Sequence, residues 1–145
     1  MDYRDLLLYK RASEVVKEPN TVIKAWPKSM QSQEISRQLF RAATSIGANI
    51  AEGHGRHKGQ EYIHFLTIAQ GSANEVDHWL NTALDCGIAS ITDLQDLIRL
   101  NNETRKMLTS AINTLQKKRD DKVIREGSSP YSPVPYSLGD PEEDL

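Results

Sequence analysis

The stretch RAATSIGANIAEG, Arg41 to Gly53, combines the apolar spacing of a helix with residues that weaken helices. Ile46 and Ile50 lie four residues apart, as side chains on one face of an amphipathic helix do. Between them, Gly47 costs a helix interior up to about 1 kcal/mol relative to alanine. Small side chains surround this glycine, and close packing against a second helix would offset the cost. We therefore predict a helix here whose small residues face a closely packed partner.

The predicted partner is the next helix along the chain. The connecting stretch GHGRHKG, residues 53–59, contains three glycines and is the clearest helix breaker in the sequence. The segment from about residue 60 to residue 86 has the strongest helical periodicity, because its apolar side chains alternate at spacings of three and four. Gly87 follows and is well placed to end this helix in the left-handed conformation. The sequence therefore predicts a pair of antiparallel helices joined by a glycine-rich turn.

A stripe of polar residues recurs at helical spacing along the first helix of this pair. Folding the pair about the turn brings Arg41 near Glu75 and sets Ser45 opposite residues 69–73. One interpretation is a buried hydrogen-bond network that fixes the register, with Arg41 paired to Glu75. The other interpretation is a contact surface for a ligand or a second subunit. The predicted structural polar residues are Arg41, Ser45, Asn49, Glu52 and Glu75.

Another helical segment precedes this pair. Apolar residues recur at helical spacing from about residue 3 to residue 26. Pro19 removes an intrahelical hydrogen bond and clashes with the preceding turn, so we predict a kink or a break there, with Asn20 at the restart. Pro27 is predicted to end the helix or nearly so, because the residue before a proline avoids the helical conformation.

Capping residues suggest where the second and fourth helices begin. Ser32 is the expected N-cap of a helix over residues 32–53. Thr92 and Gln95 have the spacing of a capping box at the start of a helix over residues 92–125. The charged end of that last segment, KKRDDKVIRE, is predicted to fray.

Four amphipathic segments with short connections predict an all-α fold, an antiparallel up-down-up-down four-helix bundle. We find no stretch of period two that would indicate a strand. The bundle is expected to occupy residues 1–126. Residues 127–145 contain several prolines and serines without apolar periodicity, and they are predicted to form a disordered or extended acidic tail.

The charge of the chain is divided between these two parts. The formal net charge of the 145 residues is −2. Residues 1–126 hold all 18 lysines and arginines and 16 of the 20 acidic residues, a net charge of +2, whereas residues 127–145 carry −4. The single cysteine, Cys86, cannot form an internal disulfide, which fits a reducing compartment. Together with the lack of an apolar run of about 20 residues, this predicts a cytoplasmic protein without a membrane anchor.

One segment is long and specific enough to resemble a known family. Residues 37–77 read RQLFRAATSIGANIAEGHGRHKGQEYIHFLTIAQGSANEVD. They resemble the bacterial four-helix-bundle family encoded by open reading frames in 23S rRNA intervening sequences, whose pattern is R-A-A-x-S-I-x-x-N-I-A-E-G followed by E-[FY]-x-x-F-L-x-I-A-x-G-S-x-x-E. The matching positions are Arg41, Ala42, Ala43, Ser45, Ile46, Asn49, Ile50, Ala51, Glu52, Gly53, Glu61, Tyr62, Phe65, Leu66, Ile68, Ala69, Gly71, Ser72 and Glu75.

The resemblance extends over residues 5–118 with two departures, which are Pro19 in the first helix and the acidic tail. It implies ring-like homo-oligomers, often pentamers, of four-helix protomers, most of them without an established activity. A related group consists of accessory proteins of diversity-generating retroelements, which bind a reverse transcriptase and its template RNA through a basic surface. The resemblance thus implies a non-enzymatic, RNA-associated accessory scaffold.

Residue patterns typical of metal sites and catalysis are weak in this chain. Two Glu-x-x-His sequences begin at Glu61 and Glu75, but both lie on one predicted helix, about 21 Å apart along its axis. They cannot share one metal pair within a protomer. Cys86 is near a helix C-terminus, where the helix dipole disfavours a thiolate. We therefore predict no cofactor, no metal site and no catalytic residue.

Basic residues give the remaining functional hypothesis. In an up-down bundle, the glycine-rich turn and the end of the last helix share one pole, so their cations would form one patch for RNA phosphates. The candidate RNA-binding residues are Arg56, Lys58, Lys117, Lys118 and Arg119. The alternative is a protein–protein interaction or structural oligomer with no nucleic-acid role, in which the tail serves as a short partner motif.

Overall fold

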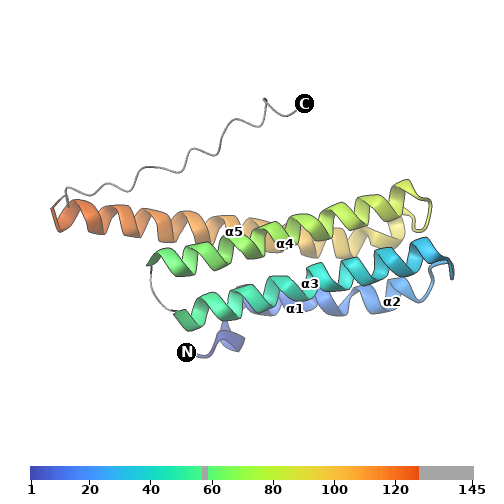
Figure 1. The fold of residues 1–145 in the computed structure, drawn as a ribbon, viewed down its shortest axis with the longest axis horizontal. Coiled ribbons are helices and arrows are strands. Elements are labelled where there is room, and N and C mark those ends of the chain that lie inside the picture. The colour runs from blue at the N-terminus through green and yellow to red at the C-terminus, as the bar shows by residue number, and fades with distance from the viewer. Residues whose placement is uncertain (57–58, 128–145) are drawn as a thin grey trace, which may run out of the picture.

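A computed structural model describes residues 1–56 and 59–127, and the predicted tail beyond Gly127 lies outside the described residues. The elements are the 3₁₀ turn η1 (Tyr3–Asp5), α1 (Leu7–Lys17), α2 (Pro19–Ile23), α3 (Met30–Arg56), α4 (Gly59–Asp85) and α5 (Ile91–Arg125). Figure 1 shows α1, α3, α4 and α5 alternating in direction, with α2 continuing the line of α1. The predicted up-down-up-down four-helix bundle is confirmed, and the described residues contain no strand.

The core lies along the axis of the bundle and is almost entirely aliphatic. The predicted seam of α4 packs most extensively against α3 and next against α5. Burying one large aliphatic side chain contributes about 1.5–3 kcal/mol, so these positions supply most of the stability. The fully buried large apolar side chains are Val15, Leu39, Ile46, Ile50, Leu66, Val76, Leu80, Leu94, Leu97 and Leu108.

The first predicted helix breaks at Pro19, as expected, but it restarts at a different residue from the predicted Asn20. Glu18 keeps helical dihedral angles, with φ −58° and ψ −42°, and Pro19 itself is the first residue of α2. Proline suits that position because the first backbone N–H of a helix has no intrahelical partner. α2 ends at Ile23, earlier than the helix end predicted near Pro27. Hydrogen-bonded turns continue the chain, and the N–H of Trp26 donates to the carbonyl of Ile23 at 3.0 Å.

Both predicted helix caps were wrong by two or three residues. The N–H of Ser32 donates to Ser29 Oγ at 3.1 Å, so Ser29 caps α3 and Ser32 is buried in its first turn. At the start of α5, the N–H of Asp93 donates to Ser90 Oγ at 3.2 Å, and the N–H of Ser90 donates to Asp93 Oδ2 at 3.3 Å. This reciprocal capping box replaces the one predicted at Thr92.

Two helix ends also differ from the prediction. α3 continues through Gly53 and Gly55 to Arg56, although the turn was expected to begin at Gly53. α5 is helical to Arg125 where fraying was expected. The predicted role of Gly87 is confirmed, since its φ of 67° lies in the left-handed region that glycine occupies without strain. Glycine disfavours a helix by only about 1 kcal/mol relative to alanine, and the two glycines do not end α3.

The capping box predicts a stability difference between two neighbouring hydroxyl residues. Ser90→Ala removes the acceptor for the N–H of Asp93 and should lower the free energy of unfolding by about 1 kcal/mol. Thr92→Ala removes an exposed hydroxyl that caps nothing and should change it by less than about 0.5 kcal/mol. Urea unfolding followed by circular dichroism measures both. A larger loss for Thr92→Ala would contradict the observed cap.

Candidate nucleic-acid interface

The polar stripe of α3 forms a small hydrogen-bonded contact with α4. Ser45 Oγ lies 2.9 Å from Ser72 Oγ across the two helices. Asn49 Nδ2 donates to the carbonyl of Ser45 at 2.8 Å and to its Oγ at 3.1 Å. Ser45 is therefore opposite residues 69–73, as antiparallel folding about the turn requires. Two short hydroxyl side chains bridge the helices only where the backbones approach closely.

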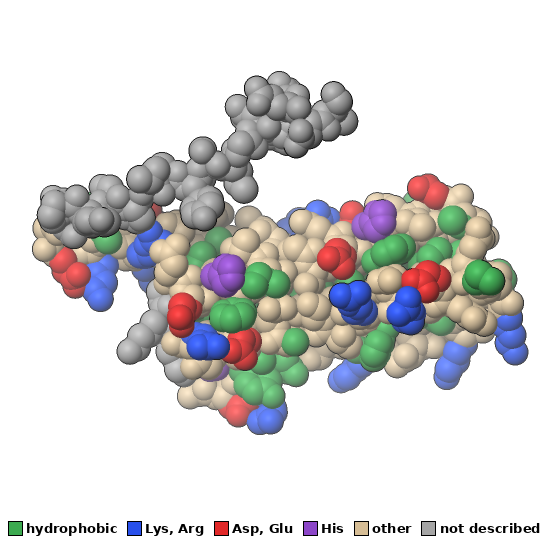
Figure 2. All heavy atoms as spheres, viewed as in Figure 1, with side chains coloured by type: hydrophobic (Ala, Val, Ile, Leu, Met, Phe, Trp, Pro, Cys, Tyr) green, Lys and Arg blue, Asp and Glu red, His purple; other side chains and the backbone are tan. Residues whose placement is uncertain are grey.

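The long side chains of the stripe do not join this contact, so the predicted pair between Arg41 and Glu75 was wrong. Both residues are exposed, and they form no ion pair within the described chain. Glu52 instead pairs with Arg56 one turn further along α3, at 3.0 Å. Exposed charges gain little from pairing because water already solvates them. Figure 2 shows acidic, basic and apolar side chains interspersed over this face.

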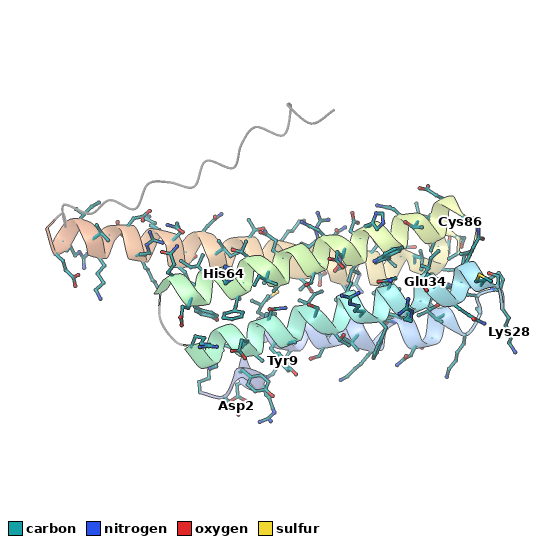
Figure 3. All side chains as sticks on the ribbon, viewed as in Figure 1. Asp2, Tyr9, Lys28, Glu34, His64 and Cys86 are labelled. Carbon is teal, nitrogen blue, oxygen red and sulfur yellow. The ribbon has the colours of Figure 1, made fainter. Side chains whose placement is uncertain are left out.

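The two glycines of the opening stretch pack against different neighbours. A Cβ added at Gly47 would lie 3.3 Å from Cε2 of Tyr9, so this glycine makes room for α1, whereas the sequence suggested α4. Figure 3 labels Tyr9 beside α3, near the N-terminus. A Cβ added at Gly53 would lie 2.9 Å from the Cβ of Phe65. The close approach of α3 and α4 therefore depends on Gly53.

Four of the five candidate RNA-binding residues are among the described residues, and they lie toward one pole of the bundle. Figure 1 shows that α3 ends, α4 begins and α5 ends on the side of the N-terminus. Arg119 Nη1 donates to Gln60 Oε1 and so ties the end of α5 to the start of α4. Arg56 pairs with Glu52, and its guanidinium lies 5.8 Å from the ring centre of Phe65. Lys58 lies outside the described residues. Arg56 is thus partly neutralised within its own helix.

The two remaining candidates directly precede Arg119 on α5, beside the start of α4. Lys117 and Lys118 are exposed, and the described residues offer them no ion pair. α5 has 35 residues against 27 in α4, and its last turns project beyond the other helices (Figure 1). These two ammonium groups are available for contacts with an anionic partner.

A polar groove between α4 and α5 was missed by the sequence-based search. It has a volume of about 940 Å³ and is lined by Gln70 and Asn74 of α4 and by Asn102, Arg105, Lys106, Thr109, Ser110, Asn113 and Thr114 of α5. Gln70 Nε2 donates to Thr109 Oγ1 at 2.6 Å, and Arg105 Nε donates to Asn74 Oδ1 at 3.0 Å. The sequence does contain one sign of this groove, because residues 104–119 of α5 include five cations and no acidic residue.

Among the described residues, two titratable side chains have displaced pKa values, and neither shift yields a general acid or base near neutral pH. Hydrogen bonds from Gln38 and Arg37 lower the pKa of the Glu34 carboxyl. Burial raises the pKa of the Tyr62 phenol. Within the described ranges, no group of three or more metal-ligating side chains is placed to hold an ion. Among these residues, no helix has both the length and the apolar content needed to cross a bilayer.

Comparisons with known proteins agree with the four-helix fold. The sequence model of a family described as "23S rRNA-intervening sequence protein" matches residues 4–110. The fold is similar to a 1.70 Å crystal structure of a protein with unknown function from the S23 ribosomal protein family of Bacteroides thetaiotaomicron VPI-5482, with 26% identity and a TM-score of 0.63. The match covers 73% of this chain and 98% of that chain. A comparison with curated proteins gives no match.

Proposed function

Because this chain belongs to the 23S rRNA-intervening sequence protein family, we propose that it is a non-enzymatic scaffold that associates with RNA in the cytoplasm. In this proposal the chain forms a homo-oligomer, expected to be a pentamer, and acts as an accessory protein. An assembly of a reverse transcriptase with its RNA is one setting that such a scaffold would support. The family relationship supports the scaffold role, and the exposed cations near the end of α5 support the association with RNA.

The observation that carries the proposal is a run of three cations, Lys117, Lys118 and Arg119, near the end of α5. Lys117 and Lys118 are exposed and without ion pairs among the described residues, and Arg119 is held beside the start of α4 by Gln60. Exposed cations that lack ion pairs bind phosphates favourably, because each contact releases counterions from the nucleic acid. A single patch of three cations is modest. Repetition around an oligomer would make it multivalent and raise its apparent affinity.

Apolar side chains on the surface support self-association. Phe40 of α3 is 55% exposed and Ile68 of α4 is 40% exposed. These side chains offer apolar area that a second copy of the chain could cover. The charged end of α5 lies away from them along the bundle axis, so the proposed contact between copies and the proposed RNA contact use different surfaces.

Charge reversal at the end of α5 tests the RNA contact. The triple variant Lys117→Glu, Lys118→Glu, Arg119→Glu should lose nearly all affinity for a fluorescein-labelled RNA, measured by anisotropy across a salt series. The natural protein should bind with an affinity that falls steeply with salt, by a log–log slope of about −0.9 per phosphate contact. The control reverses the same charge at Lys10, Lys24 and Lys28, which are exposed on the α1 and α2 side.

The oligomeric mass of each variant, measured by light scattering, separates the two candidate functions. The proposal requires that the triple variant keep the mass of the natural protein while losing RNA. A changed mass would show that the end of α5 is a contact between copies. Absence of RNA binding by the natural protein at low salt, with an intact oligomer, would favour the alternative function. That alternative is a protein-interaction or structural oligomer in which residues 127–145 serve as the partner motif.

A further inference from the structure

The groove between α4 and α5 has a wholly polar lining. Every lining side chain is an amide, a hydroxyl or a cation, and no carboxylate is among them. Asp77 lies just outside, with its Oδ1 3.9 Å from Nη1 of Arg105, which is too long for a direct hydrogen bond. The groove therefore offers many hydrogen-bonding groups together with positive charge.

The two cations of the groove, Arg105 and Lys106, have different surroundings. Arg105 Nε donates to Asn74 Oδ1 at 3.0 Å, and its Nη1 donates to Asn102 Oδ1 at 3.3 Å. Both partners are neutral amides that orient the guanidinium, and the Asp77 carboxylate at 3.9 Å offsets part of its charge. Lys106 is exposed and forms no ion pair with the part of the chain that the structure describes. An anionic ligand would meet one oriented guanidinium and one exposed ammonium group.

The groove leads directly to the basic end of α5. Lys106, Ser110, Asn113 and Lys117 follow the spacing i, i+4, i+7, i+11 and so lie along one stripe of the helix. Eleven residues of α-helix span about 17 Å. No acidic residue interrupts α5 between Glu103 and Asp120. The stripe thus has a cation at each end and two neutral hydrogen-bonding side chains between them, over a length that covers several phosphates of a nucleic acid.

The lining also indicates the form of nucleic acid. Single strands are held mainly by aromatic side chains that stack on their bases, and the groove has none. Double-stranded RNA is recognised through its phosphates and 2′-hydroxyl groups, which suit cations and amide or hydroxyl side chains respectively. We propose that the groove between α4 and α5 binds the ribose–phosphate backbone of double-stranded RNA without reading its bases. This inference rests on the proposed RNA association. It specifies the surface that binds RNA and the form of RNA that is bound.

The experiment compares three labelled probes of equal length, an RNA hairpin, an unpaired RNA strand and a DNA hairpin, by anisotropy across a salt series. The natural full-length protein should bind the RNA hairpin most tightly. Arg105→Gln with Lys106→Gln removes two phosphate contacts, so affinity for the hairpin should fall at least tenfold near 0.1 M salt and the slope should flatten by about 1.8. Lys106→Gln alone, at an exposed position, should give about half of that change in slope.

Two further variants separate charge from recognition of ribose. Asn113→Ala should reduce the preference for the RNA hairpin over the DNA hairpin and leave the salt slope unchanged, because it removes no cation. Lys24→Gln with Lys28→Gln matches the charge change of the double groove variant. Figure 3 shows Lys28 at the end of the bundle opposite to the end of α5, so this control should bind like the natural protein.

The possible failures are distinct. If the natural protein binds RNA and the groove variants match the lysine control, the groove assignment is overturned and the proposed RNA association stands. Tighter binding of the unpaired strand than of the hairpin would overturn the double-stranded ligand. Equal binding of the RNA and DNA hairpins would overturn the ribose contact. If no probe binds to the natural protein at low salt, both the proposed function and this inference are wrong.

Discussion

Asn101→Asp is expected to lower the free energy of unfolding by about 3 to 4 kcal/mol at pH 7. Asn101 is 1% exposed, and its Nδ2 donates to the carbonyl of Ala73 in α4 at 3.0 Å. Its Oδ1 is buried without a partner. A carboxylate at this position would lose the donor, face the carbonyl oxygen of Ala73 and remain unpaired. The cost is bounded because the introduced carboxyl can take up a proton.

The pH dependence of this variant has a definite sign. The introduced carboxyl should have a folded-state pKa well above its unfolded value of about 3.9, so the destabilisation is present above that value. As the pH falls, the protonated carboxyl can again donate to Ala73, and stability should return relative to the natural protein by about 1.4 kcal/mol per pH unit. Urea unfolding of both proteins between pH 7 and pH 4.5 measures this difference.

The neighbouring residue provides a matched control. Asn102 is half-buried, and its Oδ1 accepts a hydrogen bond from Arg105 at 3.3 Å. Asn102→Asp therefore places the same charge beside a guanidinium and should change stability by less than about 1 kcal/mol. Equal stability of the two variants at pH 7 would show that solvent reaches Asn101 and that the buried link between α4 and α5 does not hold in solution.

Gly53→Ala is expected to destabilise the fold by about 1 to 2 kcal/mol, although alanine is the better helix former. The added methyl group would meet the Cβ of Phe65 at 2.9 Å and Cδ2 of Tyr62 at 3.0 Å. A Cβ is anchored to the backbone and cannot rotate away, so α3 and α4 must separate. Overpacking of this kind costs about 1–3 kcal/mol. The gain in helix propensity, at most about 1 kcal/mol, offsets only part of it.

Gly71→Ala is the matched control for this substitution. Gly71 lies in the middle of α4, and a Cβ added there meets nothing within 4 Å. Its replacement should raise the free energy of unfolding by up to about 1 kcal/mol through helix propensity alone. The two glycine variants should therefore move the urea midpoint in opposite directions. A Gly53→Ala protein that is as stable as the natural one would show that α3 and α4 have room at this level.

The candidate site was only partly predictable from the residues. The sharing of one pole by Arg56 and Arg119 follows from alternating helix directions. The pairing of Arg56 with Glu52 and the contact of Arg119 with Gln60 depend on side-chain positions that periodicity does not specify. The groove between α4 and α5 was missed because amides and hydroxyls on an exposed helix face resemble ordinary solvated surface.

The sequence by itself determined the number, order and approximate extent of the helices, the left-handed Gly87 and the family. These features depend on local spacing and on backbone preferences that each residue carries wherever it lies. Tertiary structure decided which neighbour each residue meets. Gly47 accommodates Tyr9 rather than α4, and Arg41 remains exposed rather than paired with Glu75. Helical spacing assigns a residue to a face, whereas its contacts depend on the rotation and separation of packed helices, which the whole core sets together.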